Sequence, residues 1–567
     1  MHRAFSIPEI VFSICNTLAQ GTSDMEGDGP YSISDPGTLA ICARTCRAFH
    51  LPAVSALWQY DMLTMETVLL HCMPSDLWNL ETGAEQYLSR RADRMTLQRP
   101  IRPDDLTRLA HYAPLINRIA VGSASHHLYI RANRRRLANP PFLSDDAHLA
   151  LSLACPTPIF PNLRHLFWND QSANILRITP YLSPSLVTLD IDLHDSNPTH
   201  SPIIQHLPLR CPNMGQFTIS CLAEHELALR NIASMLSPAV CAWNLRKFGS
   251  PTADHATIRH LSQCPSLTTL SIYYLAPPLD QSDTAKLTHP GAFSFLRTML
   301  IHRLAMDHCV ELIQGCSFTN LEELTLKPLN PSTSSFSGLL RAIRDAHARP
   351  QLLHLLRVAE NTVLTQVDPP PLRDADIEPL LTFPALSGLV LSCAGGFDLA
   401  DSTILRMTEA WPSLERLKLS GLQRPTWDRR LSLRALVPLA LNCPKLRTLA
   451  LELDATRVAY DRNPPRPATP HCLRHISVLW SPIGSHRVVA GFLSVVFPGV
   501  RAVLVADDVD ERAARRWDLV GLTTQLIVKL REHERMDRLG LSQPSVNSNV
   551  DDVDYISTPE SEAEVND

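Results

Sequence analysis

Glycine is scarce in this sequence, since its 567 residues include 20 Gly against 45 Pro. The glycine-rich patterns that hold nucleotide phosphates, Gly-x-Gly-x-x-Gly and Gly-x-x-x-x-Gly-Lys-Ser/Thr, do not occur. The zinc motif His-Glu-x-x-His and the nucleophile turn Gly-x-Ser-x-Gly are also missing. These absences argue against a nucleotide-dependent enzyme, a zinc protease and a serine hydrolase. We therefore expect neither catalysis nor a bound metal or cofactor.

The sequence also lacks a strong excess of charge and any long apolar run. It has 52 Lys and Arg against 57 Asp and Glu, a formal net charge of −5, so we expect no nucleic-acid partner. No 18 consecutive residues are apolar, and no membrane partner is expected. The 14 Cys are spread along the chain instead of forming a small disulfide scaffold, which favours reduced thiols in the cytoplasm or nucleus.

What the sequence does contain is a repeated motif. Its template is apolar-Pro-x-Leu-x-x-Leu-x-Leu/Ile, and its clearest copies are FPNLRHLFW (160–168), CPSLTTLSI (264–272), WPSLERLKL (411–419) and CPKLRTLAL (443–451). The copies between Leu163 and Val500 recur on average every ~28 residues, at the long end of the range for leucine-rich repeats.

The motif has a simple physical interpretation. Leucines two positions apart point to the same side of a strand, while the residue between them points to the other side. The preceding proline lacks an N–H group and ends a helix. One such unit cannot bury its apolar side alone, whereas stacked units form a continuous core. The sequence therefore predicts an α/β solenoid, a curved array with its strands on the concave side and its helices on the convex side.

A different pattern precedes the repeats. Apolar residues recur at helical spacing near the N-terminus, and Pro8 suits the first turn of a helix. A polar stretch at 21–37 and two further apolar segments follow, the second ending at Trp58. We expect three short helices here. One interpretation is a helical cap that seals the first repeat, as solenoids require at their ends.

The same segment resembles the F-box motif, and the downstream repeats extend the resemblance over almost the whole chain to fungal-type F-box proteins with leucine-rich repeats. The matching positions are Ile7-Pro8-Glu9-Ile10, Ile14, Leu18, Leu39, Thr45-Cys46-Arg47, Phe49 and Leu57-Trp58. The segment departs from the motif in beginning with Ile, in lacking one residue between Pro8 and Glu9, and in its longer loop at 21–37.

The resemblance implies a docking role for the helices. In the family, the F-box binds the adaptor subunit of a cullin-RING ubiquitin ligase while the repeats hold the substrate. The adaptor-binding residues implied here are Ile7, Pro8, Ile10, Ile14, Leu18, Leu39, Leu57 and Trp58.

The predicted organisation has five parts. They are an F-box-like helical module at 1–60, a helical linker at 61–110, leucine-rich repeats at 111–507, a C-terminal capping helix at 508–540 and a disordered acidic tail at 541–567. The capping helix is predicted from an amphipathic pattern that includes Trp517, Leu519, Leu522, Leu526 and Leu530.

A substrate is expected on the concave side, at positions that alternate with the core leucines. The candidates from the template are His165, Phe167, Asp190, Asp192, Tyr273, Glu323, Lys327, Arg416 and Lys418. Their mixture of charged and aromatic side chains suits a protein target better than a phosphate ligand.

Together these features predict a non-catalytic substrate-recognition subunit of a cullin-RING (SCF-type) ubiquitin ligase. Its partners would be the adaptor, a cullin held through the adaptor, and a target protein that the sequence does not identify. We expect one copy of the chain in such a complex. The alternative is a leucine-rich-repeat scaffold that binds proteins, has a helical cap and is not coupled to a ligase.

Overall fold

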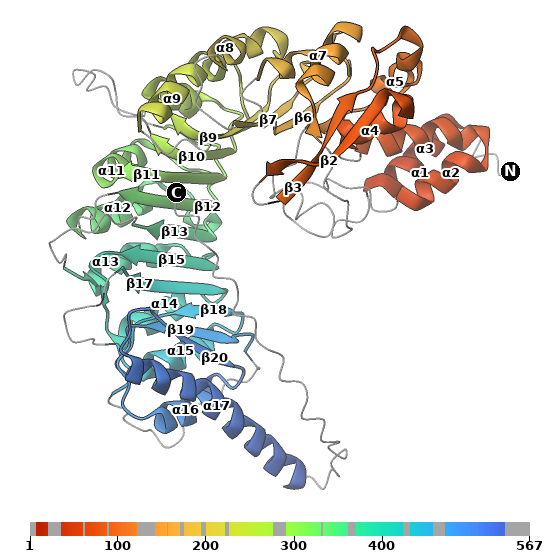
Figure 1. Ribbon diagram of the computed structural model, residues 1–567. Coiled ribbons are helices and arrows are strands. Elements are labelled where there is room, and N and C mark those ends of the chain that lie inside the picture. The colour runs from red at the N-terminus through yellow and green to blue at the C-terminus, as the bar shows by residue number, and fades with distance from the viewer. Residues whose placement is uncertain are drawn as a thin grey trace. The chain divides into compact units, whose positions relative to one another are not determined.

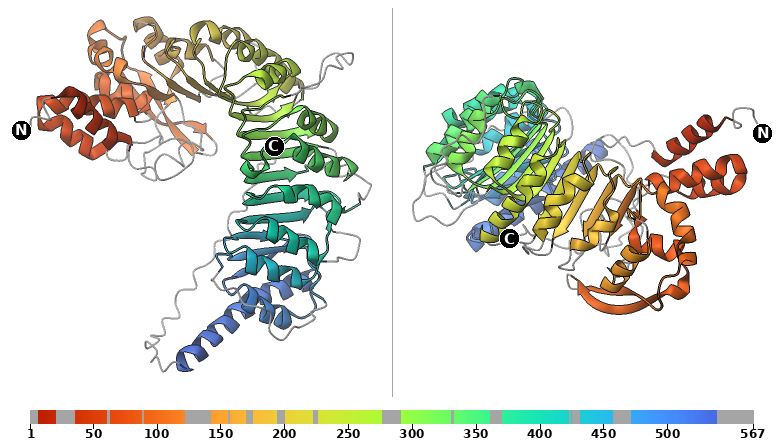
Figure 2. Two further views of the ribbon diagram at one scale, coloured as in Figure 1. Left: turned by 180° about the vertical axis from the view of Figure 1, so that it is seen from behind. Right: turned by 90° about the horizontal axis from the view of Figure 1, so that it is seen from above.

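The structure is a computed structural model (Figures 1 and 2). It describes residues 7–20, 36–60, 63–87, 90–121, 142–155, 157–169, 175–193, 200–221, 226–275, 291–329, 333–360, 370–422, 424, 431–456 and 471–538. The chain divides into two compact units, Met1–Asp283 and Thr284–Asp567. The predicted acidic tail at 541–567 and most of the loop at 21–37 lie outside the described residues.

The first unit begins with three helices, as the apolar spacing predicts. They are α1 (Pro8–Gln20), α2 (Pro36–Thr45) and α3 (Arg47–Tyr60). Their shared core consists of Val11, Cys15, Ala19, Leu39, Ala53 and Ala56. Small residues on α3 allow the helices to approach closely, and α3 is in contact with both other helices. The three helices therefore form a module with its own core.

The linker after this module contains a β-hairpin that the predicted helical linker did not include. Its helices are α4 (Met65–Cys72) and the short α5 (Thr107–Tyr112). Between them, β2 (Trp78–Tyr87) pairs antiparallel with β3 (Arg90–Leu97), and β3 pairs with β5 (Phe142–Leu143). The partner strand β5 lies far along the chain, so local periodicity in the linker could not indicate this small sheet.

The remaining strands of the first unit form a parallel sheet. In spatial order they are β1 (Leu63–Thr64), β4 (Arg118–Val121), β6 (His165–Asn169), β7 (Thr188–Leu193), β8 (Gln216–Cys221), β9 (Lys247–Ala253) and β10 (Thr269–Leu275). The intervening helices are α7 (Asp145–Ala154), α8 (Ser201–Arg210), α9 (Glu226–Cys241) and α10 (His255–Gln263). Figures 1 and 2 show these helices along one side of the strands.

The second unit repeats the arrangement. Its strands, again parallel and in spatial order, are β11 (Thr298–Ala305), β12 (Glu323–Leu329), β13 (Leu355–Ala359), β15 (Gly388–Cys393), β17 (Arg416–Gly421), β18 (Thr448–Ala450), β19 (His475–Leu479) and β20 (Ala502–Val505). Its helices are α11 (Met306–Gly315), α12 (Thr333–Ala346), α13 (Asp374–Ile377), α14 (Asp401–Ala410), α15 (Leu436–Asn442), α16 (His486–Val496) and α17 (Glu511–Arg538). A two-stranded sheet of β14 (Leu372–Arg373) and β16 (Phe397–Asp398) lies beside them.

Burial along the strands follows the predicted alternation. In β7 and β12 every second residue is buried, beginning with Leu189 and Leu324, the second leucine of each motif copy. These leucines lie in register from strand to strand and form a continuous apolar row. In the second unit the row is Leu324, Leu356, Leu389, Leu417, Leu449, Ile476 and Val503. Each unit is therefore α/β, with the parallel strands and stacked helices expected of a solenoid.

The residue that follows the motif proline links neighbouring repeats. Asn162 donates a side-chain hydrogen bond of 2.8 Å to the carbonyl of Pro114, and Asn213 donates one of 3.2 Å to the carbonyl of Pro184. Ser266 likewise donates to the carbonyl of Leu245 at 2.8 Å. These bonds satisfy carbonyls that the loops leave without helix or sheet partners. In the part of the chain that the structure describes, no helix is both long and apolar enough to cross a membrane.

Candidate functional site

The first candidate surface lies on α1. We call Ile7, Pro8 and Ile10, together with the hollow beside them, the α1 surface. Ile7 and Ile10 are 45% and 38% exposed. The hollow is lined by Pro8, Glu9, Phe12, Ser13, Asn16 and Thr17. Val11, Cys15 and Ala19 of α1 pack into the module core, whereas Ile7 and Ile10 remain exposed among the described residues.

The other predicted adaptor-binding residues lie mostly inside the module. Leu39 is fully buried, which corrects its prediction as a surface contact. Leu18 and Leu57 pack against the module core, and Ile14 is half-buried. The ring of Trp58 stacks on that of Tyr112, with centroids 5.0 Å apart, and so joins α3 to the linker.

Two exposed residues of the module were missed by the sequence analysis. Ile41 on α2 is 67% exposed, and Leu51 on α3 is 56% exposed. Ile41 is two positions after Leu39, so the two side chains point to opposite sides of the helix. Helical phase could have identified Ile41 as the exposed residue of this pair, but only once the buried side of α2 was known.

The second candidate surface is the strand side of the first unit, which carries five of the predicted substrate-binding residues. His165, Asp190 and Asp192 are half-buried, and Tyr273 is largely exposed. Phe167 is instead buried, which leaves it little area to offer a target. The strand register brings Phe167 opposite Asp190, so the predicted residues of β6 and β7 do lie together.

Two acidic residues on β7 have different environments. Burial raises the pKa of Asp190 to about 6, and the nearby Asp192 raises it further while Lys247 opposes the shift. Asp192 accepts a hydrogen bond of 3.1 Å from the hydroxyl of Ser220. Because Asp190 has this raised pKa, its carboxyl becomes protonated as the pH falls through 6. The negative charge on this strand side then decreases.

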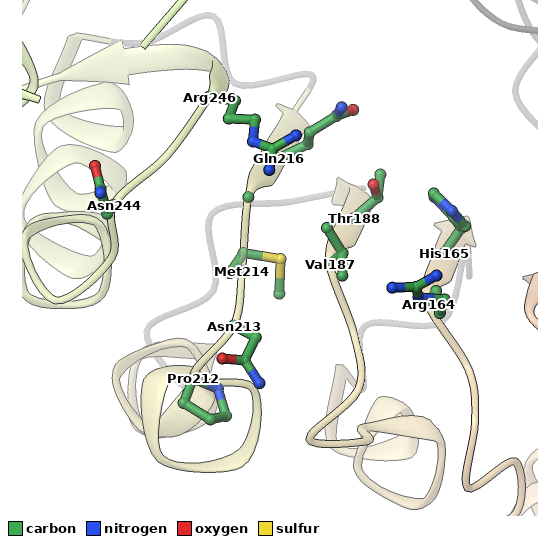
Figure 3. Close-up of a pocket in the computed structure, with 11 residues that line it drawn as sticks. Arg164, His165, Val187, Thr188, Pro212, Asn213, Met214, Gln216, Asn244 and Arg246 are labelled. Atoms are coloured by element: carbon green, nitrogen blue, oxygen red, sulfur yellow. The ribbon is translucent and has the colours of Figure 1, made fainter. Parts of the chain in front are cut away.

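A pocket opens at the edge of the sheet where the strands begin (Figure 3). Residues of β6, β7 and β8 and of the loops before β8 and β9 line it. Figure 3 shows Arg164 next to His165 on one side and Arg246 next to Gln216 on the other. Among the described residues, neither arginine side chain has an ion-pair partner.

The pocket combines positive charge with fixed polar groups. Burial, and then the neighbouring Arg118 and Arg164, lower the pKa of His165 to about 4, so its imidazole is neutral at neutral pH. Asn213 and Asn244 are held by hydrogen bonds to Pro184 and Ser266. Two guanidinium groups around a neutral, hydrogen-bonded lining suit an acidic group of a ligand.

Within the ranges that the structure describes, no three His, Cys, Asp or Glu side chains are placed to hold a metal ion.

The second unit has a positively charged strand side. Arg416 and Lys418 are exposed on β17, and Lys327 is half-exposed on β12. Glu323 lies 3.6 Å from the imidazole of His354. The register places Arg357 of β13 between Thr325 of β12 and Val390 of β15, in the same row as Lys418.

Arg357 and His302 were missed among the candidate residues. Burial lowers the pKa of His302 to about 4, with further contributions from Lys327, Arg357 and Arg303. Arg357 occupies the outward position of the weak repeat copy PQLLHLLRV (350–358), so the template could have identified it. His302 comes directly after the nine residues of its repeat copy, so the template does not include it. Its position beside Lys327 is known only from the strand register.

Comparison with known proteins assigns the chain to no family. No protein-family model matches the chain. No curated protein matches it either. Among solved structures, a chain of the "Crystal structure of Rad7 and Elc1 complex in yeast" is similar, with 17% identity over 58% of this chain and 79% of that chain, and a TM-score of 0.29.

Proposed function

We propose that this chain is a non-catalytic substrate-recognition subunit of a cullin-RING (SCF-type) ubiquitin ligase. In this proposal, α1–α3 are an F-box that binds the ligase adaptor, and the strand side of the leucine-rich repeats binds a target protein. The observation that carries the proposal is the α1 surface: apolar side chains remain exposed on a module that has a buried core of its own.

The exposed apolar residues of the module favour a protein partner. Single exposed apolar side chains are common, but Ile7 and Ile10 lie one helical turn apart beside a hollow that includes Phe12. An apolar helix of a partner could fill this hollow and bury both isoleucines. Burial of an exposed aliphatic side chain contributes about 1–2 kcal/mol to binding.

The pocket of Arg164 and Arg246 supports the second half of the proposal. It provides a place where an acidic segment of the target would bind, because both guanidinium groups lack partners among the described residues. Charge-assisted hydrogen bonds to a carboxylate or phosphate are stronger than neutral ones. The surface would thus select targets by negative charge.

Adaptor binding tests the first half of the proposal. We expect the full chain to capture the adaptor stoichiometrically and the Ile7→Asp/Ile10→Asp variant to lose this binding, because aspartate cannot enter an apolar interface without a large desolvation cost. A pull-down followed by quantification of both chains measures this. Leu80→Asp is the matched control, since Leu80 is 48% exposed on β2, outside the α1 surface.

Two outcomes would count against the ligase role. If the wild-type chain fails to capture the adaptor, or if the α1-surface variant captures it as well as the control does, the proposal is wrong. Unchanged thermal unfolding of both variants shows that the loss of binding does not come from loss of folding.

Charge recognition at the pocket is tested separately. We expect Arg164→Glu and Arg246→Glu each to weaken binding of acidic peptides by about 10-fold or more, because each removes a charge-assisted contact and adds a repulsion. Fluorescence anisotropy with acidic, phosphorylated and neutral peptides of equal length measures this and separates carboxylate from phosphate recognition. Lys445→Glu, an exposed basic residue outside the pocket, is the control. Equal binding of neutral peptides would refute charge selection.

A scaffold without ligase coupling is the second candidate. The ring of Trp58 stacks on that of Tyr112, and the guanidinium of Arg108 lies 5.9 Å from the centre of the tyrosine ring. These contacts join the helical module to the linker, which is what a cap on a solenoid requires, and so they favour the scaffold. Normal target binding together with failure to bind the adaptor would select this candidate.

A further inference from the structure

Helix α17 has two apolar sides, and only one of them is buried by the described residues of the second unit. Trp517, Val520 and Thr524 are buried, and the indole N–H of Trp517 donates a 2.9 Å hydrogen bond to the carbonyl of Ser481. This side packs against α16 and β20. The end of the array is therefore covered by Trp517, Val520 and Thr524. The leucines whose amphipathic pattern predicted the helix do not cover it.

Those leucines form an exposed row on the other side of α17. The row, which we call the leucine stripe, consists of Leu519, Leu522, Leu526 and Leu530, with exposed fractions of 43%, 65%, 58% and 55%. Their spacings of three, four and four residues place them along one side of the helix. From Lys529 onward the described side chains of α17 are exposed all round. Figure 1 shows this end of the helix (blue) extending away from the strands of its unit.

Such a stripe is unusual on a surface that contacts only water. Isolated exposed leucines need no explanation, but four in a continuous row resemble the seam by which helices associate. The helix has 28 residues, a length of about 42 Å, so a partner helix of similar length could cover the whole stripe.

The pattern of the stripe is nearly the same when read in either direction. An antiparallel second copy, related by a two-fold axis at the level of Thr524, brings Leu519 opposite Leu530 and Leu522 opposite Leu526. Helical phase places these four side chains on the stripe itself. A two-fold interface of this kind uses the same surface on both copies, and each contact occurs twice.

The flanking charges favour the same arrangement. Asp518 and Lys529 lie on one flank of the stripe and become neighbours across the two-fold axis. Opposite charges at flanking positions set the orientation of paired helices. A parallel pair would instead bring each flank against the opposite flank of the partner, so that Asp518 and Lys529 would not meet.

We propose that the leucine stripe of α17 is a homodimer interface, in which two copies of the chain pair through antiparallel α17 helices. This differs from the single copy expected from the sequence. The dimer would carry two target-binding surfaces and increase the apparent affinity for targets with two binding segments. The proposal does not depend on the ligase role.

The first test is the oligomeric state of the full chain. Sedimentation velocity over a wide range of concentrations should show a monomer–dimer equilibrium. The Leu522→Glu/Leu526→Glu variant should raise the dimer dissociation constant by about a hundredfold or more, because it places four unpaired charges in the apolar seam. Leu405→Glu is the control, since Leu405 is 43% exposed on α14, outside the stripe, and it should dimerise like the wild type.

Charge exchange tests the antiparallel orientation. Asp518→Lys alone and Lys529→Asp alone should each weaken the dimer, and the double exchange should restore it, because the opposite charges then meet again across the axis. Asp518 and Lys529 are exposed, so neither change disturbs the core. A chain that stays monomeric at every concentration, a dimer that tolerates the stripe variant, or a double exchange without rescue would overturn the proposal. Binding of the adaptor or of a tail peptide to the stripe of a monomeric chain would also overturn it.

Discussion

At the scale of single residues, the repeats carry polar groups inside a mostly apolar core. Glu360, at the end of β13, is buried and accepts a hydrogen bond of 2.6 Å from the N–H of Ala394. Burial raises the pKa of its carboxyl to about 7, and the bond from Ala394 only partly opposes the shift. Because burial penalises the charged form, ionised Glu360 destabilises the folded state relative to its protonated form.

The pH dependence of stability follows from this sign. A carboxyl whose pKa is raised on folding contributes stability below its unfolded pKa, and that contribution is lost as the pH rises through 7. We expect Glu360→Gln, which keeps an acceptor for Ala394, to stabilise the second unit by about 1–3 kcal/mol at pH 8 and to have little effect at pH 4. Chemical unfolding of wild type and variant at both pH values measures this. An equal effect at both would show that Glu360 does not titrate as stated.

At the scale of elements, close packing of α17 on the last strand depends on a residue without a side chain. A Cβ atom at Gly521 would lie 3.0 Å from the carbonyl oxygen of Arg501 and 3.4 Å from the Cα of Ala502. The helix can therefore approach β20 only while this position remains glycine. A Cβ at Gly338 on α12, in contrast, has no neighbour within 4 Å.

The same substitution at these two positions should have different results. Gly521→Val should lower the free energy of unfolding by about 1–3 kcal/mol, because it forces α17 away from β20. Gly338→Val should change it by less than about 0.5 kcal/mol, since the side chain enters open space. Thermal or urea unfolding measures both. Equal losses would mean that the packing of α17 on β20 does not limit stability.

At the scale of the whole molecule, the sequence predicted the parts that depend on local repetition. The Leu-x-Leu motif predicts strands whose alternate residues are buried, and the structure shows this alternation in β7 and β12. The β2–β3 hairpin could not be predicted in this way, because its pairing with Phe142–Leu143 joins segments far apart in sequence.

The candidate sites were predicted less completely than the fold. For α17, two sides of the helix are apolar, so periodicity could not decide which side packs on the array. For the helical module, Leu39 was expected on the surface and lies in the core, because spacing alone does not say which neighbours enclose a helix. The pocket of Arg164 and Arg246 could not be predicted from the template, because both arginines come one residue before the outward positions that the template identifies. Only the three-dimensional structure brings them together.

Coupling of this chain to a ligase is tested by a titration of the adaptor–cullin complex into the full chain by isothermal calorimetry. We expect saturable binding with one adaptor per chain, lost in the Ile7→Asp/Ile10→Asp variant and kept in Leu80→Asp. The absence of binding by the wild-type chain would contradict the ligase role and leave a protein-binding scaffold in its place.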